Sequence, residues 1–329
     1  MEKSNIEELY EWMDHITHLI QQYVNETYLD SLAYTMEILF HQKVPDGFDK
    51  QLTHKLQQIL DKLNMDTYTT VEIRKANQLV ILKGMKGSTQ QQHMMTPETV
   101  ALIVAYLSSK LFTDKKKLRI FDPAGGTGNL LTTVLHQLPQ AKEAYASEVD
   151  PTLIQLAAWN ANLQKMQIEF FHQDSLQPFL LDPVDLIVSD LPVGYYPDDV
   201  HARIFELKAE EGLSYAHHLF LEQSLNYTKP GGYLIFIIPE FLFTSDQAEQ
   251  LRQFIHKYAH IVGVLSLSDT VFQSEKHRRS ILILQKKGQH TTAPNQPLLV
   301  KMPSFSNSSA MENILGQINN WFQMYNKRS

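Results

Sequence analysis

A glycine-rich segment follows a short apolar run at residues 118–122, and its residue types suit the binding of a nucleotide-like ligand. Asp122 ends the apolar run, and an apolar helix start follows the bend. Because glycine has no Cβ, backbone N–H groups in such a bend can approach a ligand closely. We therefore predict a cofactor site at the carboxyl end of a parallel strand. In this segment the site residues are Asp122, Pro123, Ala124, Gly125, Gly126, Gly128 and Asn129.

Two features of this segment bear on which cofactor it binds. A dinucleotide fingerprint has Gly or Ala three places after its second glycine, whereas Leu131 stands there in this chain. Asp122 would repel a pyrophosphate, but it can attract a positive centre or accept hydrogen bonds. Both features favour S-adenosylmethionine, which has a cationic sulfonium and no phosphate. The alternatives are a nicotinamide dehydrogenase and a strand–turn–helix without a ligand.

Two more acids follow later strands. Glu148 lies near the end of a predicted strand at 143–149, about twenty residues after the loop, where an acid can bind both ribose hydroxyls. Asp174 follows a predicted strand at 168–172 and would lie near the adenine end of the cofactor. Their neighbours Val149 and Ser175 are included in the same predicted site. The alternatives are an ordinary loop carboxylate for Glu148 and a helix N-cap for Asp174.

A second group of residues suits the capture of a flat polar amine. Asp190 ends a buried-strand pattern at 184–190, and a proline-containing turn with two tyrosines follows it. Asp190 and the Leu191 carbonyl could accept both N–H bonds of an exocyclic amino group, which would free the nitrogen lone pair for in-line attack on a methyl group. Catalysis would then be mostly positioning. Pro192 stiffens the turn, and Tyr195 or Tyr196 could stack on a base. The alternative is a capping Asp beside core aromatic residues.

The elements that would position these residues follow two different patterns. Residues 1–87 have helical spacing of apolar residues, and the polar run 88–93 is a plausible linker. Residues 93–287 alternate strand and helix, which predicts a Rossmann-like α/β fold with a mostly parallel sheet of seven strands. The last two strands are joined by a short connection and are expected to be antiparallel. Residues 288–329 read as a linker followed by a final helix. The strands are predicted at 118–122, 143–149, 168–172, 184–190, 232–239, 260–267 and 279–286.

The composition of the chain argues against several classes of protein and of binding site. The chain has 329 residues, 43% of them hydrophobic, a net charge of −7 and no cysteine. Disulfides and cysteine zinc sites are therefore excluded. Without a long apolar run or a secretory signal, no membrane span is expected and a cytoplasmic location is favoured. The acidic net charge argues against strong non-specific binding to nucleic acid. Two basic clusters are present, at 115–117 and 277–279, and the second could bind phosphate groups. His217 and His218 are interpreted as core or surface residues, and no metal site is predicted.

The motifs together resemble a known family. The Asp122–Gly128 segment resembles the first motif of class I S-adenosylmethionine-dependent methyltransferases, and in particular of the N6-adenine DNA methylases of type I restriction systems. Thr96 and Pro97 resemble the Thr-Pro segment that seats the methionine end of the cofactor, and they also read as a helix cap and first helical position. Asp190-Leu191-Pro192-Val193 stands where the family has Asn/Asp-Pro-Pro-Tyr/Phe. The likeness covers about 93–287, and the N-terminal helices resemble the YtxK-like bacterial group.

The resemblance implies S-adenosylmethionine as cofactor and an N-methyltransferase that acts on the adenine amino group of DNA or another nucleic acid. In this chain Leu191 replaces the first proline and Val193 the stacking aromatic, and no long target-recognition domain follows the last strand. A cofactor-binding protein without DNA methylation, or a methyltransferase for another amine, are therefore the alternatives. Three roles are open for the N-terminal helices: to cover the site, to contact a partner or to form a homodimer.

Overall fold

The structure is a computed structural model, and it describes residues 3–86, 95–113, 117–178, 180–268 and 278–327. The predicted linker at 88–93 lies outside the described residues. The helices are α1 Asn5–Val24, α2 Tyr28–His41, α3 Lys50–Leu60, α4 Thr70–Lys86, α5 Glu98–Leu111, α6 Asn129–Gln137, α7 Pro151–Leu163, α8 Asp199–Ala202, α9 Ala216–Asn226, α10 Ala248–Tyr258 and α11 Ser308–Asn326, with short 3₁₀ helices at Met65–Thr67 and Glu240–Phe243. The strands are β1 Leu118–Asp122, β2 Ala141–Glu148, β3 Glu169–His172, β4 Val184–Asp190, β5 Thr228–Pro239, β6 Ala259–Ser266, β7 Arg279–Lys286 and β8 Leu298–Lys301.

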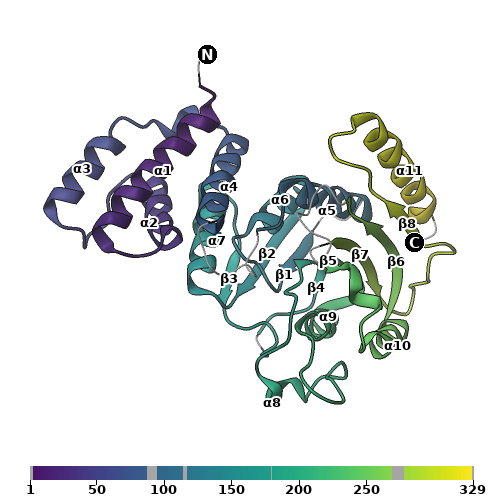
Figure 1. The fold of residues 1–329 in the computed structure, drawn as a ribbon. Coiled ribbons are helices and arrows are strands. Elements are labelled where there is room, and N and C mark those ends of the chain that lie inside the picture. The colour runs from purple at the N-terminus through teal and green to yellow at the C-terminus, as the bar shows by residue number, and fades with distance from the viewer. Residues whose placement is uncertain (1–2, 87–94, 114–116, 179, 269–277, 328–329) are drawn as a thin grey trace.

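The strands form one sheet in the order β3-β2-β1-β4-β5-β7-β6-β8 (Figure 1). β1 to β5 pair in parallel, whereas β7 pairs antiparallel with β5 and β6. The predicted α/β fold with an antiparallel seventh strand is thus confirmed. The sheet order changes direction between β1 and β4, and the carboxyl ends of both strands lie at the same edge. Ligands of open α/β sheets bind at such a point.

Within the described residues the sheet has eight strands, one more than the sequence predicted. Leu298–Lys301, inside the region read as a linker, forms β8 and pairs in parallel with β6. It is a four-residue edge strand, with Leu298 buried and Leu299 71% exposed. So short a segment has too few residues for its alternation to stand out from the surrounding polar chain, and only pairing with β6 makes it a strand.

Helices cover both faces of the sheet. α5, α6 and α11 pack on one face, and α9 and α10 on the other, as two separate apolar clusters (Figure 1). β4 and β5 are buried along nearly their whole length, as expected for strands covered on both sides. These central strands are therefore held rigidly, and their carboxyl ends make a firm base for a site.

The N-terminal helices form one apolar core of their own and share another with α7 of the sheet domain. α7 lies beside these helices (Figure 1), and its Leu156 and Leu163 share an apolar cluster with α1, α2 and α4. Thr69 and Glu72 form a capping box at the start of α4: Glu72 accepts a 2.7 Å hydrogen bond from the Thr69 N–H, and the Glu72 N–H donates to the Thr69 hydroxyl at 3.3 Å. Leu79 of this helix is 43% exposed. The division of the chain near residue 87 stays a prediction.

Candidate functional site

The glycine-rich loop after β1 makes a tight bend. The Gly125 N–H donates to the Ser147 carbonyl at 2.9 Å, and the Gly128 N–H donates to the Gly125 carbonyl at 2.8 Å. Gly126 and Gly128 have φ of 52° and 75°, which side chains with a Cβ rarely adopt. A Cβ on Gly128 would lie 3.3 Å from the Ala157 side chain, whereas a Cβ on Gly126 would meet no described atom within 4 Å. The loop thus packs against α7 at Gly128 and faces open space at Gly126.

Glu148 joins the end of β2 to this loop. One carboxylate oxygen accepts the Gly126 N–H at 2.9 Å, and the other accepts the N–H groups of Val149 and Asp150 at 2.9 and 3.0 Å. A carboxylate has about four acceptor positions, and three are used here, so about one remains for a hydrogen bond from a ligand hydroxyl. Val149 is 63% exposed beside it. The predicted ribose acid and the predicted loop are therefore in direct contact.

Asp122 is buried beneath the loop at the end of β1, with 1% of its surface exposed. It accepts the Ser189 hydroxyl at 2.9 Å and the Ala124 N–H at 3.1 Å. Burial raises the pKa of Asp122 to about 7, and the nearby Asp190 and Glu148 carboxylates add to the rise. Near neutral pH this carboxyl is balanced between its two protonation states, so an approaching cation would favour the charged form.

Asp190 ends β4 and is held by a residue far away in the sequence. The Thr96 hydroxyl donates a hydrogen bond to the Asp190 carboxylate at 2.9 Å. Thr96 was expected to cap the helix, with Pro97 as its first residue; instead Pro97 is the N-cap and α5 begins at Glu98. A carboxylate is the stronger acceptor for a hydroxyl, which accounts for this correction. Burial raises the pKa of Asp190, while Arg279 and the Thr96 hydrogen bond lower it.

The turn after Asp190 is locked against the segment before α9. The Leu191 N–H donates to the Ile237 carbonyl at 3.1 Å, and the Ala216 N–H donates to the Gly194 carbonyl at 2.9 Å. Leu191 is buried and Pro192 is exposed. Tyr195 stacks on Tyr215 with ring centroids 4.9 Å apart and is 57% exposed. One ring of this pair is therefore open to a stacking partner close to the strand end.

Tyr196, in contrast, is used within the fold. It is 6% exposed, and its hydroxyl donates to Asp174 at 2.6 Å. Asp174 also accepts the Leu176 N–H at 2.9 Å, in a turn and not at a helix N-cap. The Ser175 hydroxyl donates to the Pro123 carbonyl at 2.5 Å and so supports the glycine-rich loop. Of the two tyrosines, Tyr195 is the one available to stack on a base.

Several residues near Asp190 and the glycine-rich loop either have contacts that the sequence did not predict or are absent from the predicted site. Asn129 was predicted as a cofactor residue, but its side chain donates to the Thr96 carbonyl at 2.7 Å and accepts from Gln78 of α4. Ser189 was not predicted, although a hydroxyl one residue before the strand-end acid is a signal that could have pointed to it. Arg279 begins β7 close to Asp190. His277 and residues 115–116 of the basic clusters lie outside the described residues.

His217 and His218 are core residues of α9. Both are fully buried, and their rings pack around Tyr215 at 5.0 and 5.3 Å. Their ring nitrogens have no hydrogen-bond partner within the described part of the chain. Burial lowers the pKa of His217 to about 3 and that of His218 to about 4. Both imidazoles are therefore neutral at physiological pH.

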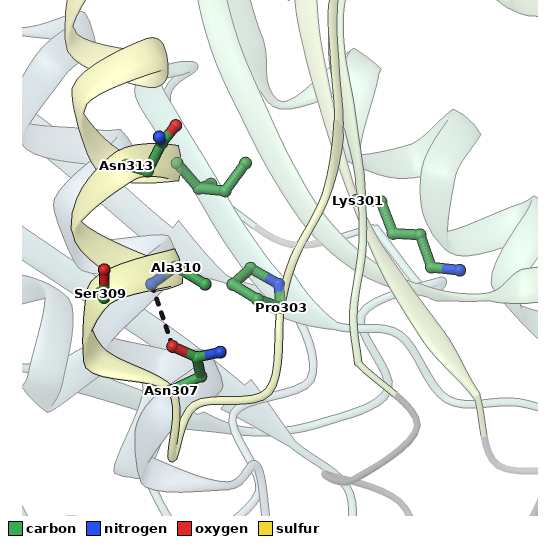
Figure 2. A pocket seen from close by; sticks show the side chains of 7 residues that line it. Lys301, Pro303, Asn307, Ser309, Ala310 and Asn313 are labelled. Atoms are coloured by element: carbon green, nitrogen blue, oxygen red, sulfur yellow. Dashed lines mark hydrogen bonds between the residues drawn. The ribbon is translucent and has the colours of Figure 1, made fainter.

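The remaining features of the described residues do not add to the candidate site. No three His, Asp or Glu side chains there come together as metal ligands, and none of the helices there could cross a membrane. A hollow of 470 Å³ lies between the end of β8 and the start of α11 (Figure 2). There Asn307 caps α11 by accepting the Ala310 N–H at 3.1 Å. This hollow lies at the outer edge strand, away from β1 and β4.

Comparison with protein families and with other protein sequences finds matches over nearly the whole chain. Residues 7–85 match the YtxK N-terminal helical domain, and residues 84–327 match the N-6 DNA methylase family. The sequence is 46% identical over 327 residues to the uncharacterised protein YtxK of Bacillus subtilis strain 168, which covers 98% of this chain and 99% of that protein.

Solved structures of methyltransferases also superpose on this chain. A Listeria monocytogenes protein assigned as a class I S-adenosylmethionine-dependent methyltransferase superposes with a TM-score of 0.90 at 42% identity, covering 96% of this chain and 98% of that one. The methyltransferase subunit of a type I restriction-modification system from Streptococcus thermophilus has a TM-score of 0.65 at 15% identity, covering 93% of this chain and 74% of that one. This second likeness concerns the fold alone.

Proposed function

The chain belongs to the N-6 DNA methylase family, whose model matches residues 84–327, and from this premise we propose that it methylates the exocyclic amino group of adenine in DNA or another nucleic acid. By family and fold it is an S-adenosylmethionine-dependent methyltransferase. The observation that carries the proposal is that Asp190, held by Thr96, lies at the same sheet edge as the glycine-rich loop and its two acids.

The residues at this edge fit S-adenosylmethionine. Gly126 faces open space, so its backbone can be approached by a ligand. Glu148 retains about one acceptor position, to which a ribose hydroxyl could donate, and the carboxyl of Asp122 suits a cationic centre. Asp174 and Ser175 would border the adenine end. Thr96 and Pro97 would support the methionine end.

The chemistry of the proposed reaction is mostly a matter of orientation. When bound, S-adenosylmethionine supplies an electrophilic methyl group. The Asp190 carboxylate and the Leu191 carbonyl would accept hydrogen bonds from the two N–H groups of the acceptor amine, which leaves its lone pair directed at the methyl carbon. As the N–C bond forms, the S–C bond of the cofactor would break, the neutral thioether would leave, and one N–H proton would pass to the Asp190 carboxylate or to water. Pro192 would limit the freedom of the turn. The exposed ring of Tyr195 would stack on the base, in the role that Val193 cannot fill.

A methyl-transfer assay tests the proposal. The protein is incubated with methyl-tritiated S-adenosylmethionine and DNA without N6-methyladenine, or RNA, and the labelled nucleoside is identified by mass spectrometry. We expect N6-methyladenosine or its deoxy form, and a loss of at least about 100-fold in Asp190→Ala, as for removal of a group acting in the transition state. Asp199→Ala, which removes an exposed acid in the same segment, is the matched control and should keep full activity.

Other outcomes identify the alternatives. Cofactor binding by calorimetry without label in any acceptor would make the chain a binding protein. Label in a small amine and not in nucleic acid would move the acceptor to another class. Equal transfer by wild type and Asp190→Ala would remove Asp190 from the mechanism. Binding of NADH in place of S-adenosylmethionine would overturn the cofactor itself. Sedimentation of the full chain tests the proposed homodimer through the N-terminal helices.

A further inference from the structure

Helix α4 of the N-terminal region has two buried faces of different character. One is apolar and packs on α1 and α2. The other is polar: Arg74, Asn77 and Gln78 are 7%, 0% and 6% exposed, at the spacing of residues on one side of a helix. Buried polar side chains require hydrogen-bond partners. The partners of these three residues all lie in the methylase-like part of the chain.

Gln78 begins a chain of buried hydrogen bonds that ends at the proposed acceptor site. Its side-chain amide donates to the Asn129 side-chain oxygen at 2.5 Å, and the Asn129 amide donates to the Thr96 carbonyl at 2.7 Å. The Thr96 hydroxyl then donates to Asp190 at 2.9 Å. Gln78, Asn129 and Thr96 are 6%, 3% and 8% exposed, so water competes little for these bonds.

Asn77 holds the same loop from a second side. Its amide donates to the Asn160 side-chain oxygen at 3.0 Å, and the Asn160 amide donates to the Thr127 carbonyl at 3.1 Å. Arg74 adds an ion pair with Glu98 at the start of α5, at 2.9 Å. Two adjacent residues of α4 are thus connected to Thr127 and Asn129, on either side of Gly128 at the end of the glycine-rich loop.

From these contacts we propose that Gln78 and Asn77 are positioning residues of the cofactor site, through which the N-terminal helices set the shape of the glycine-rich loop and its affinity for S-adenosylmethionine. The inference rests on the proposed function. A loop with three glycines loses much conformational freedom when it is ordered. Contacts that order it before the cofactor binds remove that cost from the binding step.

Gln78→Glu tests this with little change of shape. The ionised carboxylate cannot donate to Asn129, and it faces an oxygen that is left without its donor. We expect the Kd for S-adenosylmethionine, measured by calorimetry, to rise roughly 10-fold, which corresponds to about 1.4 kcal/mol. Leu79→Ala is the matched control, because Leu79 is the next residue of α4 and is 43% exposed. Its Kd should stay within roughly twofold of wild type.

Hydrogen exchange of the cofactor-free protein gives a second readout. In Gln78→Glu we expect faster exchange in the amides of residues 122–131, with unchanged exchange in β5 and β7. Should this variant fail to fold, Gln78→Met, which keeps the length and lacks the donor, replaces it. Unchanged Kd and loop exchange, or faster exchange spread over the whole sheet, would overturn the inference. If wild type does not bind S-adenosylmethionine, the proposed function fails, and the loop exchange still decides the role of Gln78.

Discussion

The Thr96 hydroxyl lies 2.9 Å from the Asp190 carboxylate, although the two residues are 94 positions apart in the chain. This hydrogen bond brings the start of α5 to the carboxyl end of β4. It therefore connects the segment expected to support the methionine end of the cofactor with the acid expected to bind the acceptor amine. The protonation state of Asp190 depends on this contact, because the hydrogen bond favours its charged form.

Replacement of Thr96 by valine should alter the pH dependence of methyl transfer. The change keeps the branched shape and removes the hydroxyl, so the pKa of Asp190, already raised by burial, should rise further. The charged form would then require higher pH, and the acidic limb of the rate profile should move to higher pH, with transfer reduced roughly 10-fold near pH 7. Thr96→Ser retains the donor and should restore the wild-type profile. An unshifted profile in Thr96→Val would contradict this role.

The affinity for S-adenosylmethionine should weaken as the pH falls below 7. The pKa of Asp122 is raised to about 7 by burial, so the carboxyl is protonated below this pH and loses its attraction for a cation. We expect the Kd to increase as the pH is lowered from 8 to 7 and then to 6, by at most about tenfold for each pH unit below the pKa of Asp122. Asp122→Asn should bind weakly with a flatter profile. The ionisable groups of the ligand contribute equally to both proteins, so an identical slope in the variant would exclude Asp122 as the titrating group.

Two loop glycines should respond differently to alanine. In Gly126→Ala the new Cβ meets no described atom within 4 Å, so the free energy of unfolding should fall by only about 1 kcal/mol, from the positive φ. Cofactor binding should nevertheless weaken at least roughly 10-fold, because the methyl group occupies the side open to the ligand. In Gly128→Ala the Cβ also approaches Ala157 at 3.3 Å, and the loss of stability should be larger, about 2 to 3 kcal/mol. Urea unfolding and calorimetry separate the two effects; equal stability losses would contradict the packing difference.

Acid should destabilise the protein partly through its buried histidines. The pKa values of His217 and His218 are lowered to about 3 and 4. Between these values and pH 6.5 the unfolded chain binds protons that the folded chain does not, so their contribution to stability is complete above pH 6.5 and is lost as pH falls toward 3. The double variant His217→Phe, His218→Phe should lose roughly 4 kcal/mol less than wild type between pH 6.5 and 4.5 in urea unfolding. Parallel curves for the two proteins would show that other groups control acid unfolding.

The sequence by itself was sufficient to predict the features of the fold and site that depend on the local pattern of residue types. Asp122, Glu148 and Asp190 each lie at or near the end of a predicted strand, and strands that alternate with helices are typically parallel, so the three acids were expected at one edge of one sheet. The glycines that require positive φ could also be recognised from their order. The seven predicted strands and the antiparallel pairing of β7 follow from the same rules, because run length and connection length are properties of the chain itself.

Only the tertiary structure decided how these elements hold one another. Thr96 reads as a helix cap in the sequence, yet it binds Asp190; Gln78 of α4 is 6% exposed and is bonded to Asn129, 51 positions away in the chain. The strand β8 exists because β6 offers it a partner. The reason is common to all three. The partner of a buried polar group or of an edge strand lies far along the chain, and its position is set by packing that no local spacing of residues encodes.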